Sequence, residues 1–239
     1  MSSKIKVEAI ILNTIRWKDT SAISQILTDE FGRVPLVSQG VYLEKKYISP
    51  SSLQTLSISK LVVSRGKNMF YLSEVESTNR MDILTKDYKS FLSAHIVIEL
   101  LQKSLEEGFS IANIYPLTKA YLNSLGKNDA FLLTAAWIFK FMSFMGYRPL
   151  ICGERLDKYY LNSNGITKTS YDIGEYVIID KLERDYIEHL LNNRFEDIKK
   201  SERGKRMLEL AVKYALFNLE INYLNSYESI NSWGKYAIN

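Results

Sequence analysis

Short apolar runs rich in β-branched side chains fill the N-terminal third of the chain, and none has the length or spacing of a helix. Single strands are indicated at "KVEAIILN" (6–13), "LQTLSISKLVVS" (53–64) and "NMFYLSEVE" (68–76), and two strands joined across "DEFG" at 21–40. Gly32 stands in that turn, where a positive φ is favoured. About five short strands in so small a span suit a closed barrel, foremost the oligonucleotide-binding (OB) fold, with an SH3-like barrel as the competitor.

The apolar spacing then changes to that of helices. The first helix is predicted over 85–108, with Thr85 as its N-cap and Gly108 as its stop. Helices over 115–126 and 128–146 follow, and the second of these is apolar nearly all round, so we expect it at the centre of a bundle. The inward stripe predicted for the first helix consists of Tyr88, Phe91, Leu92 and Ile96.

The helical pattern is interrupted at about residues 147–180, where an Asn164–Gly165 turn signal indicates a small hairpin or irregular insert. Beyond it, one helix is predicted over 180–193 and one long helix over 205–232. The chain is therefore predicted to be an α+β protein. Its domains would be a five-stranded OB-fold, nucleic-acid-binding barrel at 1–80 and a helical domain at 81–239 that carries the insert.

Charge is distributed unevenly along the chain. The net charge is +4, and residues 1–80 hold 11 Lys and Arg against 7 Asp and Glu, whereas the remainder is balanced. A basic module followed by a neutral one indicates that the first part meets polyanions, although a chance excess on the surface would look the same.

The sequence lacks the common motifs of catalysis and of cofactor binding. The sequence has no GxxxxGK[ST], GxGxxG or GxSxG motif, and its two histidines, His95 and His189, lie within helical patterns. The single cysteine, Cys152, cannot form an intramolecular disulfide, and a structural zinc site needs several ligands, so we predict no bound zinc and no cofactor. We predict a protein without enzymatic activity.

Neither the first residues nor the most apolar stretch has the pattern of a targeting or membrane-spanning segment. The first residues combine a polar start with a short apolar run interrupted by Glu8, which is not the pattern of a signal peptide. The apolar stretch 130–146 is short for a membrane span and contains Lys140, which favours a buried helix. These features predict a cytoplasmic protein that does not enter a membrane.

Basic and aromatic residues are interleaved in the N-terminal third. Cations can follow the phosphates of a single strand, and aromatic faces can stack on its bases at about 1–3 kcal/mol each. We expect Phe70 to be buried, because a small barrel needs aromatic filling, and Tyr42 and Tyr47 to be exposed. The candidate nucleic-acid-binding residues are Arg16, Lys18, Arg33, Tyr42, Lys45, Lys46, Tyr47, Arg65 and Lys67.

A second basic cluster lies at "KKSERGKR", 199–206. A solvated junction before a helix is the ordinary explanation for such a run, and a dock for an acidic peptide tail or a second strand is the functional one. The candidate partner-binding residues are Lys199, Lys200, Arg203, Lys205 and Arg206.

The order of these parts resembles the RecO family of bacterial recombination mediators. The resemblance is strongest over 6–40, where Thr20–Ser21 precedes a strand and Gly32–Arg33 lies within the run from Thr28 to Val37. "MGYRPLICG" at 145–153 matches the family element that precedes a small metal-binding knuckle. Many members carry paired CxxC motifs in that knuckle, and this chain does not. The loop that is basic in relatives also begins with uncharged residues here, and its basic residues come later, at Lys45 and Lys46.

The resemblance implies a non-enzymatic DNA-repair factor. Proteins of this family bind single- and double-stranded DNA, anneal complementary strands and engage the acidic C-terminal tail of single-strand binding protein. With RecR they help to load the RecA recombinase onto coated strands in homologous recombination, so the implied location is the cytoplasm, at the nucleoid when DNA is bound. Two alternatives remain open from the residues alone: an RNA-binding OB-fold protein and a non-enzymatic scaffold that docks other proteins.

Overall fold

The computed structural model divides into two compact units. The first consists of Met1–Asp82 together with Ser104–Lys119, and the second of Ile83–Lys103 together with Ala120–Asn239. The structure describes residues 4–43, 48–67, 69–154, 156–169 and 174–236.

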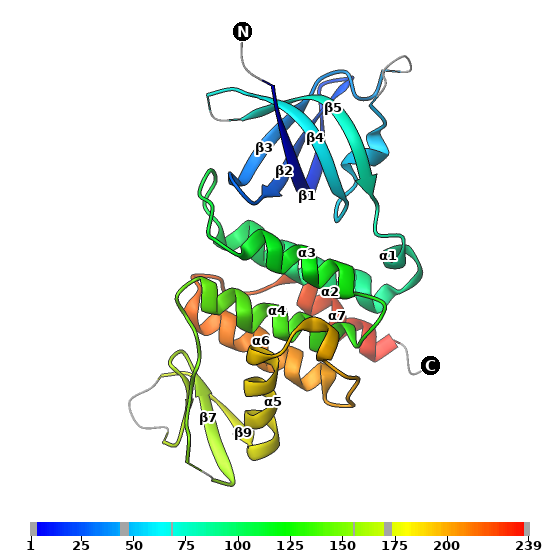
Figure 1. Cartoon of the computed structure of the whole chain (residues 1–239). Helices are drawn as coiled ribbons and strands as arrows, with labels where there is room; N and C mark the ends of the chain where they lie inside the picture. The colour runs from blue at the N-terminus through cyan, green and yellow to red at the C-terminus, as the bar shows by residue number, and fades with distance from the viewer. Residues whose placement is uncertain (1–3, 44–47, 68, 155, 170–173, 237–239) are drawn as a thin grey trace. The chain divides into compact units, whose positions relative to one another are not determined.

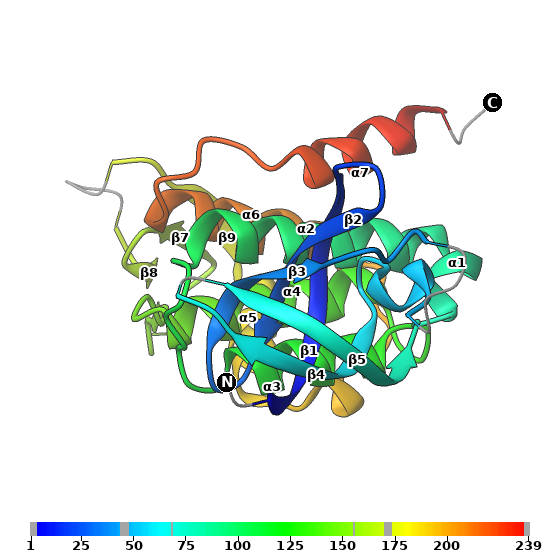
Figure 2. The ribbon, with the colours of Figure 1, turned by 90° about the horizontal axis from the view of Figure 1, so that it is seen from above.

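Five strands of the first unit close into a barrel in the order β1-β2-β3-β5-β4 (Figure 1; Figure 2 gives a second view). All neighbouring pairs are antiparallel except β3 and β5, which are parallel and pair only at Leu36–Phe70 and Val37–Tyr71. The predicted OB-type barrel is confirmed. Its strands are β1 Lys4–Trp17, β2 Ser21–Thr28, β3 Gly32–Ser38, β4 Ile58–Arg65 and β5 Phe70–Asn79, with a 3₁₀ turn η1 at Pro50–Leu53.

Strand β1 pairs with two neighbouring strands and bends at a bulge. Its first half pairs with β4 and its second half with β2, and the β1–β2 register skips one residue between Ile11 and Asn13. A bulge bends a strand and re-aims the side chains that follow it. The barrel core includes Ala9 and Ile11 from before the bulge and Phe70 from β5, which is buried as expected.

The segment 105–110, here called the strap, covers part of the edge of β3. Since β5 pairs with only two residues of β3, the beginning of β3 would otherwise present unpaired backbone groups. The strap supplies a partner on β3, since the amide of Gly108 donates to the carbonyl of Arg33 (2.8 Å). It is also held to the turn before β3, where Ser110 Oγ donates to the carbonyl of Asp29 (2.5 Å). Gly32, with φ 63°, allows the strap to approach closely.

The second unit is built around α4, which is buried along nearly its whole length. Asp129 caps its N-terminus by accepting hydrogen bonds from the amides of Phe131 and Leu132, and the Trp137 and Phe141 rings stack 4.7 Å apart. The predicted central helix is confirmed. Among the described residues, no helix has both the length and the apolar character to cross a membrane. The helical elements outside the barrel are α1 Ile83–Lys86, α2 Tyr88–Ser104, α3 Ile114–Ser124, α4 Ala130–Phe144, α5 Lys181–Asn192, α6 Gly204–Asn218 and α7 Asn225–Tyr236, with a 3₁₀ turn η2 at Phe195–Asp197.

The helix predicted over 85–108 differs from the one observed. Thr85 lies inside the one-turn helix α1, and α2 begins after Asp87, whose carboxylate accepts from the amide of Lys89 (3.1 Å). The capping carboxylate of Asp87 therefore takes the role predicted for Thr85. The predicted stripe is half right: Leu92 and Ile96 are buried, whereas Tyr88 and Phe91 are exposed.

The insert contains a hairpin, as expected, within a larger sheet. Four strands pair in the order β6-β8-β7-β9, and Figure 1 shows β7 and β9 beside α5. The loop around Cys152 is held by hydrogen bonds: Tyr159 Oη donates to the Glu154 carbonyl (2.8 Å), and Arg184 donates to the Cys152 carbonyl (3.1 Å). No group of three or more potential metal ligands occurs in the described part of the chain. The strands are β6 Leu150–Ile151, β7 Lys158–Asn162, β8 Gly165–Thr167 and β9 Val177–Asp180.

The single C-terminal helix predicted over 205–232 is wrong, because α6 and α7 are separate helices. The segment between the two helices contains Ile221 and Leu224, and both side chains are buried. The chain therefore leaves the direction of α6 before α7 begins. The first amides of α7 find an acceptor on α2: the amides of Asn225 and Ser226 donate to the two carboxylate oxygens of Glu99 at 2.9 and 2.8 Å. A side chain distant in sequence thus caps this helix.

Replacing Glu99 with Gln is expected to loosen α7 by about 1 kcal/mol, the usual worth of a helix cap. Burial acts to raise the pKa of Glu99, but hydrogen bonds from Ser226, Lys103 and Asn225 outweigh it and lower the pKa. This contribution is therefore present above the ordinary glutamate pKa and is lost as the pH falls through the lowered folded-state value. Hydrogen exchange at 225–230 should be faster in E99Q, and the wild type should match it in acid. The control is E220Q, an exposed residue between the two helices; equal exchange in both variants would contradict the cap.

Candidate nucleic-acid interface

A row of apolar side chains crosses the outside of the barrel on four neighbouring strands. The register pairs Ile15 with Ile23, Ile23 with Val37, and Val37 with Tyr71. Because side chains alternate along a strand, these residues face away from the core that Ala22, Leu36 and Phe70 help to fill. Ile15 is 54 % exposed and Tyr71 38 % exposed, whereas Ile23 is half-buried and Val37 is only 4 % exposed, so the row is open to solvent at its two ends. We call Ile15, Ile23, Val37 and Tyr71 the outer row.

A basic cluster lies at the β1–β2 turn, beyond Ile15 at one end of the outer row; Arg16 itself pairs with Ala22 and so leaves β1 on the face opposite to Ile15. Arg16 lies 5.1 Å from the centroid of the Tyr42 ring, and Lys18 Nζ lies 4.3 Å from the Trp17 ring. The amide of Tyr42 donates to the Thr20 carbonyl (2.9 Å), which ties the segment after β3 to this turn. The side chains of Arg16, Trp17, Lys18 and Tyr42 are all exposed, as predicted for Tyr42. Arg16 and Lys18 form the first basic cluster.

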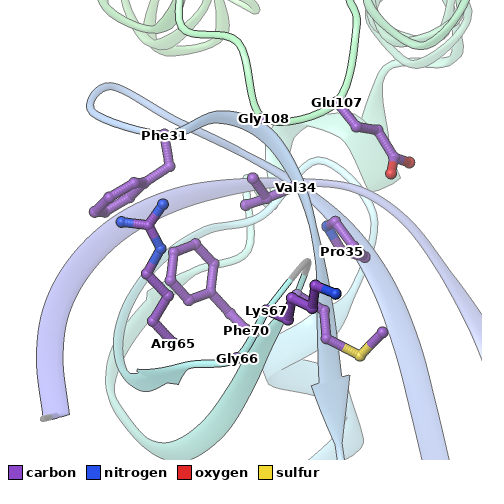
Figure 3. A pocket seen from close by; sticks show the side chains of 10 residues that line it. Phe31, Val34, Pro35, Arg65, Gly66, Lys67, Phe70, Glu107 and Gly108 are labelled. Carbon is purple, nitrogen blue, oxygen red and sulfur yellow. The ribbon is translucent and has the colours of Figure 1, made fainter. Parts of the chain in front are cut away.

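The β4–β5 hairpin brings a second basic cluster, formed by Arg65 and Lys67. The hairpin is closed by a hydrogen bond from the Gly66 amide to the Met69 carbonyl (2.8 Å). The Tyr71 ring of the outer row packs against Gly66, where an added Cβ would come within 2.8 Å of the ring. The Arg65 guanidinium lies 5.4 Å from the Phe31 ring centroid, and Figure 3 shows the two side chains next to each other. Both cations are exposed.

Three of the four cations in these clusters, Arg16, Lys18 and Lys67, form no ion pair with a described residue, although Arg16 donates to the Asp19 carbonyl (2.6 Å). In contrast, Glu8 on β1 is bonded to Lys119 Nζ, and this bond lowers its pKa despite burial, which acts to raise it. Exposed cations around exposed rings and apolar side chains are suited to phosphate contacts combined with base stacking.

Arg33 does not belong to this surface. Its Nε donates to the Leu105 carbonyl (3.0 Å) and its guanidinium pairs with Glu107 (3.4 Å), so only 16 % of the side chain is exposed. It fastens the strap, and we leave it out of the interface. Lys45, Lys46 and Tyr47 lie outside the described residues, so their predicted role in binding stays a prediction.

The cluster 199–206 in the second unit separates into two kinds of side chain. Arg203 pairs with Asp180 (3.2 Å), and Arg206 pairs with Glu183 (2.8 Å) and Glu209 (3.1 Å). The exposed remainder, for which the described residues provide no ion pair, consists of Lys199, Lys200 and Lys205.

The sequence did not predict the outer row as a unit. In the sequence, Trp17 beside the outer row and Tyr71 within it stand out only as aromatic residues. The other members of the row have the pattern of ordinary strand residues. The available signal was the run of four consecutive apolar residues in Ala9–Leu12, which breaks the strict alternation of a strand and is compatible with a bulge.

Two family models cover most of the chain. The model described as "Recombination protein O N terminal" matches residues 1–81, and the one described as "Recombination protein O C terminal" matches residues 85–228. Similar proteins include three that are each called DNA repair protein RecO. That of Thermoanaerobacter sp. (strain X514) is 25% identical over 67% of this chain and 68% of its own length. That of Caldanaerobacter subterraneus subsp. tengcongensis is 21% identical over 82% and 83%, and that of Clostridium novyi (strain NT) is 27% identical over 65% and 63%.

Proposed function

Because this chain belongs to the family of recombination protein O (RecO), a family of DNA repair proteins, we propose that it binds single- and double-stranded DNA and anneals complementary strands. The observation that carries the proposal is the outer row with a basic cluster on either side of it. The clusters would hold the sugar–phosphate chain, while Trp17 and Tyr71 offer faces on which bases can stack.

Annealing follows from the same arrangement. Two strands repel each other through their phosphates, and bound cations reduce that repulsion while displaced counterions add a favourable entropy. Base stacking tolerates any sequence, so the interface needs no code for particular bases. No covalent bond is made or broken at any step.

We propose further that the protein acts on strands coated by single-strand binding protein and, with RecR, helps to load the recombinase. The acidic C-terminal tail of single-strand binding protein would be drawn to the exposed lysines of the second unit, Lys199, Lys200 and Lys205. Arg203 and Arg206, which already hold Asp180 and Glu183, would contribute little to such a dock.

A strand-annealing assay tests the proposal. We expect complementary oligonucleotides to pair faster with the protein than without it, both bare and coated with single-strand binding protein. The K199A/K200A/K205A variant should anneal bare strands normally and lose its effect on coated strands.

Two results would count against the proposal. Binding of poly(U) in strong preference to poly(dT), with no annealing, would favour an RNA-binding function. Absence of any DNA binding at low salt, where phosphate contacts are strongest, would favour a protein scaffold.

A further inference from the structure

A pocket opens in the first unit between β3, the β4–β5 hairpin and the strap (Figure 3). It lies on the N-terminal side of the Leu36–Phe70 pair, where no pairing of β3 with β5 occurs among the described residues. The pocket has a volume of about 350 Å³, at the lower end of the range for sites that take small ligands. It is therefore large enough for a flat heterocycle and too small for an ordered peptide segment.

The lining of this pocket combines three kinds of group. Phe31 and Phe70 meet edge to face, with ring centroids 5.1 Å apart, and Val34 and Pro35 complete the apolar wall. Arg65 stands over the Phe31 ring, on the rim that also carries Lys67.

A carboxylate stands at the opposite rim from Arg65 and Phe31 (Figure 3). It belongs to Glu107 of the strap, and 48 % of this side chain is exposed. Its hydrogen bonds within the described residues, from Gln25 Nε2 (2.9 Å) and from Arg33 (3.4 Å), all go to Oε1. Oε2 accepts no hydrogen bond from the described residues and is available to a ligand at this rim.

The pocket is continuous with the outer row. Pro35 faces outward two residues before Val37 of the outer row, and Gly66 lies against the ring of Tyr71. A strand held along the outer row would therefore pass the mouth of the pocket, with Lys67 beside its phosphates.

We infer that this pocket receives one unstacked nucleobase of the bound strand. The apolar wall and the guanidinium face would enclose the base, Glu107 would accept a hydrogen bond from its pairing edge, and Arg65 and Lys67 would hold the adjoining phosphate. Every base has an N–H group on its pairing edge, so this contact discriminates little between sequences. The inference rests on the proposed function and adds to it a specific place for a base.

One consequence concerns the choice between single and double strands. A base within the pocket is neither stacked nor paired, so a duplex would have to extrude a nucleotide in order to use it. The pocket therefore favours single strands, whereas the basic clusters attract both forms.

Oligonucleotides with and without bases test the inference. We would measure the dissociation constants for a dT₁₀ strand and for a fully abasic strand with the same phosphates. One stacked base changes affinity about 5- to 150-fold, so wild type should bind dT₁₀ at least about fivefold more tightly. F31L should lower that ratio by the share of one base, at least about fivefold, with its affinity for the abasic strand unchanged; the share of the bases stacked on Trp17 and Tyr71 should remain. R65K, which retains the charge but not the planar face, should reduce the ratio in the same direction.

The control is F109L, the same replacement at a ring of the strap that is 67 % exposed and does not line the pocket. F109L should keep the wild-type ratio. A full wild-type ratio in both F31L and R65K would overturn the inference while leaving the proposed function standing. Failure of wild type to bind either strand would instead overturn the proposed function.

Discussion

Reversal of all four charges in the two basic clusters is expected to weaken binding of single-stranded DNA at least a hundredfold at low salt. Each phosphate that a protein cation neutralises releases condensed counterions, and on a single strand it adds about 0.7 to the steepness of log K against log salt. With four phosphates no longer neutralised, the slope should become shallower by about 3. Fluorescence anisotropy of a labelled oligonucleotide at several salt concentrations measures both quantities. The variant carries the changes R16E, K18E, R65E and K67E.

A control with the same change in net charge separates the interface from the overall field of the protein. It reverses four exposed lysines that lie outside both basic clusters, on β4, on α1, between α3 and α4, and on β7. We expect it to retain at least half of the wild-type slope. An equal loss of affinity in both variants would mean that binding follows net charge and that the two clusters have no special role. The control carries K60E, K86E, K127E and K158E.

The replacement of Gly32 by alanine is expected to destabilise the first unit by about 3–5 kcal/mol, which is in the range of severe single substitutions. Gly32 has φ 63°, where a side chain costs about 1–2 kcal/mol. The added Cβ would also lie 2.0 Å from the carbonyl oxygen of Phe109, so strap and turn could not keep their positions. Urea unfolding, with hydrogen exchange at the Gly108 amide, measures the destabilisation.

Gly108 provides a matched control in the strap itself. Its φ is 80°, yet an added Cβ would meet no atom within 4 Å. G108A should therefore show only the backbone penalty, about 1–2 kcal/mol. If G32A and G108A were equally destabilised, the close approach of the strap would not matter. Since the strap forms one wall of the pocket, G32A should also reduce the preference for dT₁₀ over the abasic strand.

Local patterns were sufficient to predict the barrel and the central helix. Period-two runs, the turn at Gly32 and the uninterrupted apolar character of 130–146 each describe interactions between residues close in sequence. The same reasoning identified Phe70 as buried and Tyr42 as exposed. It could also place cations at strand ends, because those positions follow from where the strands stop.

Helix boundaries near the middle and the end of the chain were less predictable. Asp87 replaced Thr85 as the capping residue, and the break between α6 and α7 contains neither glycine nor proline. The break is stabilised by Glu99, more than a hundred residues earlier. Helix propensity depends on neighbouring residues only, so it cannot predict a helix start that is capped by a side chain of another helix.

The sequence by itself determined which residues form strands and helices, since alternation, helical spacing and turn glycines act within a few residues. Only the tertiary structure decided which side of the barrel each residue faces: alternation from Ala9 and Ile11 would point Ile15 inward, and the bulge at Leu12 turns it outward. It also decided which cations remain available, because Arg33 was matched to Glu107, a partner 74 residues away. The physical reason is the same in both cases: register and ion pairing depend on how distant segments meet, and no short stretch of sequence contains that information.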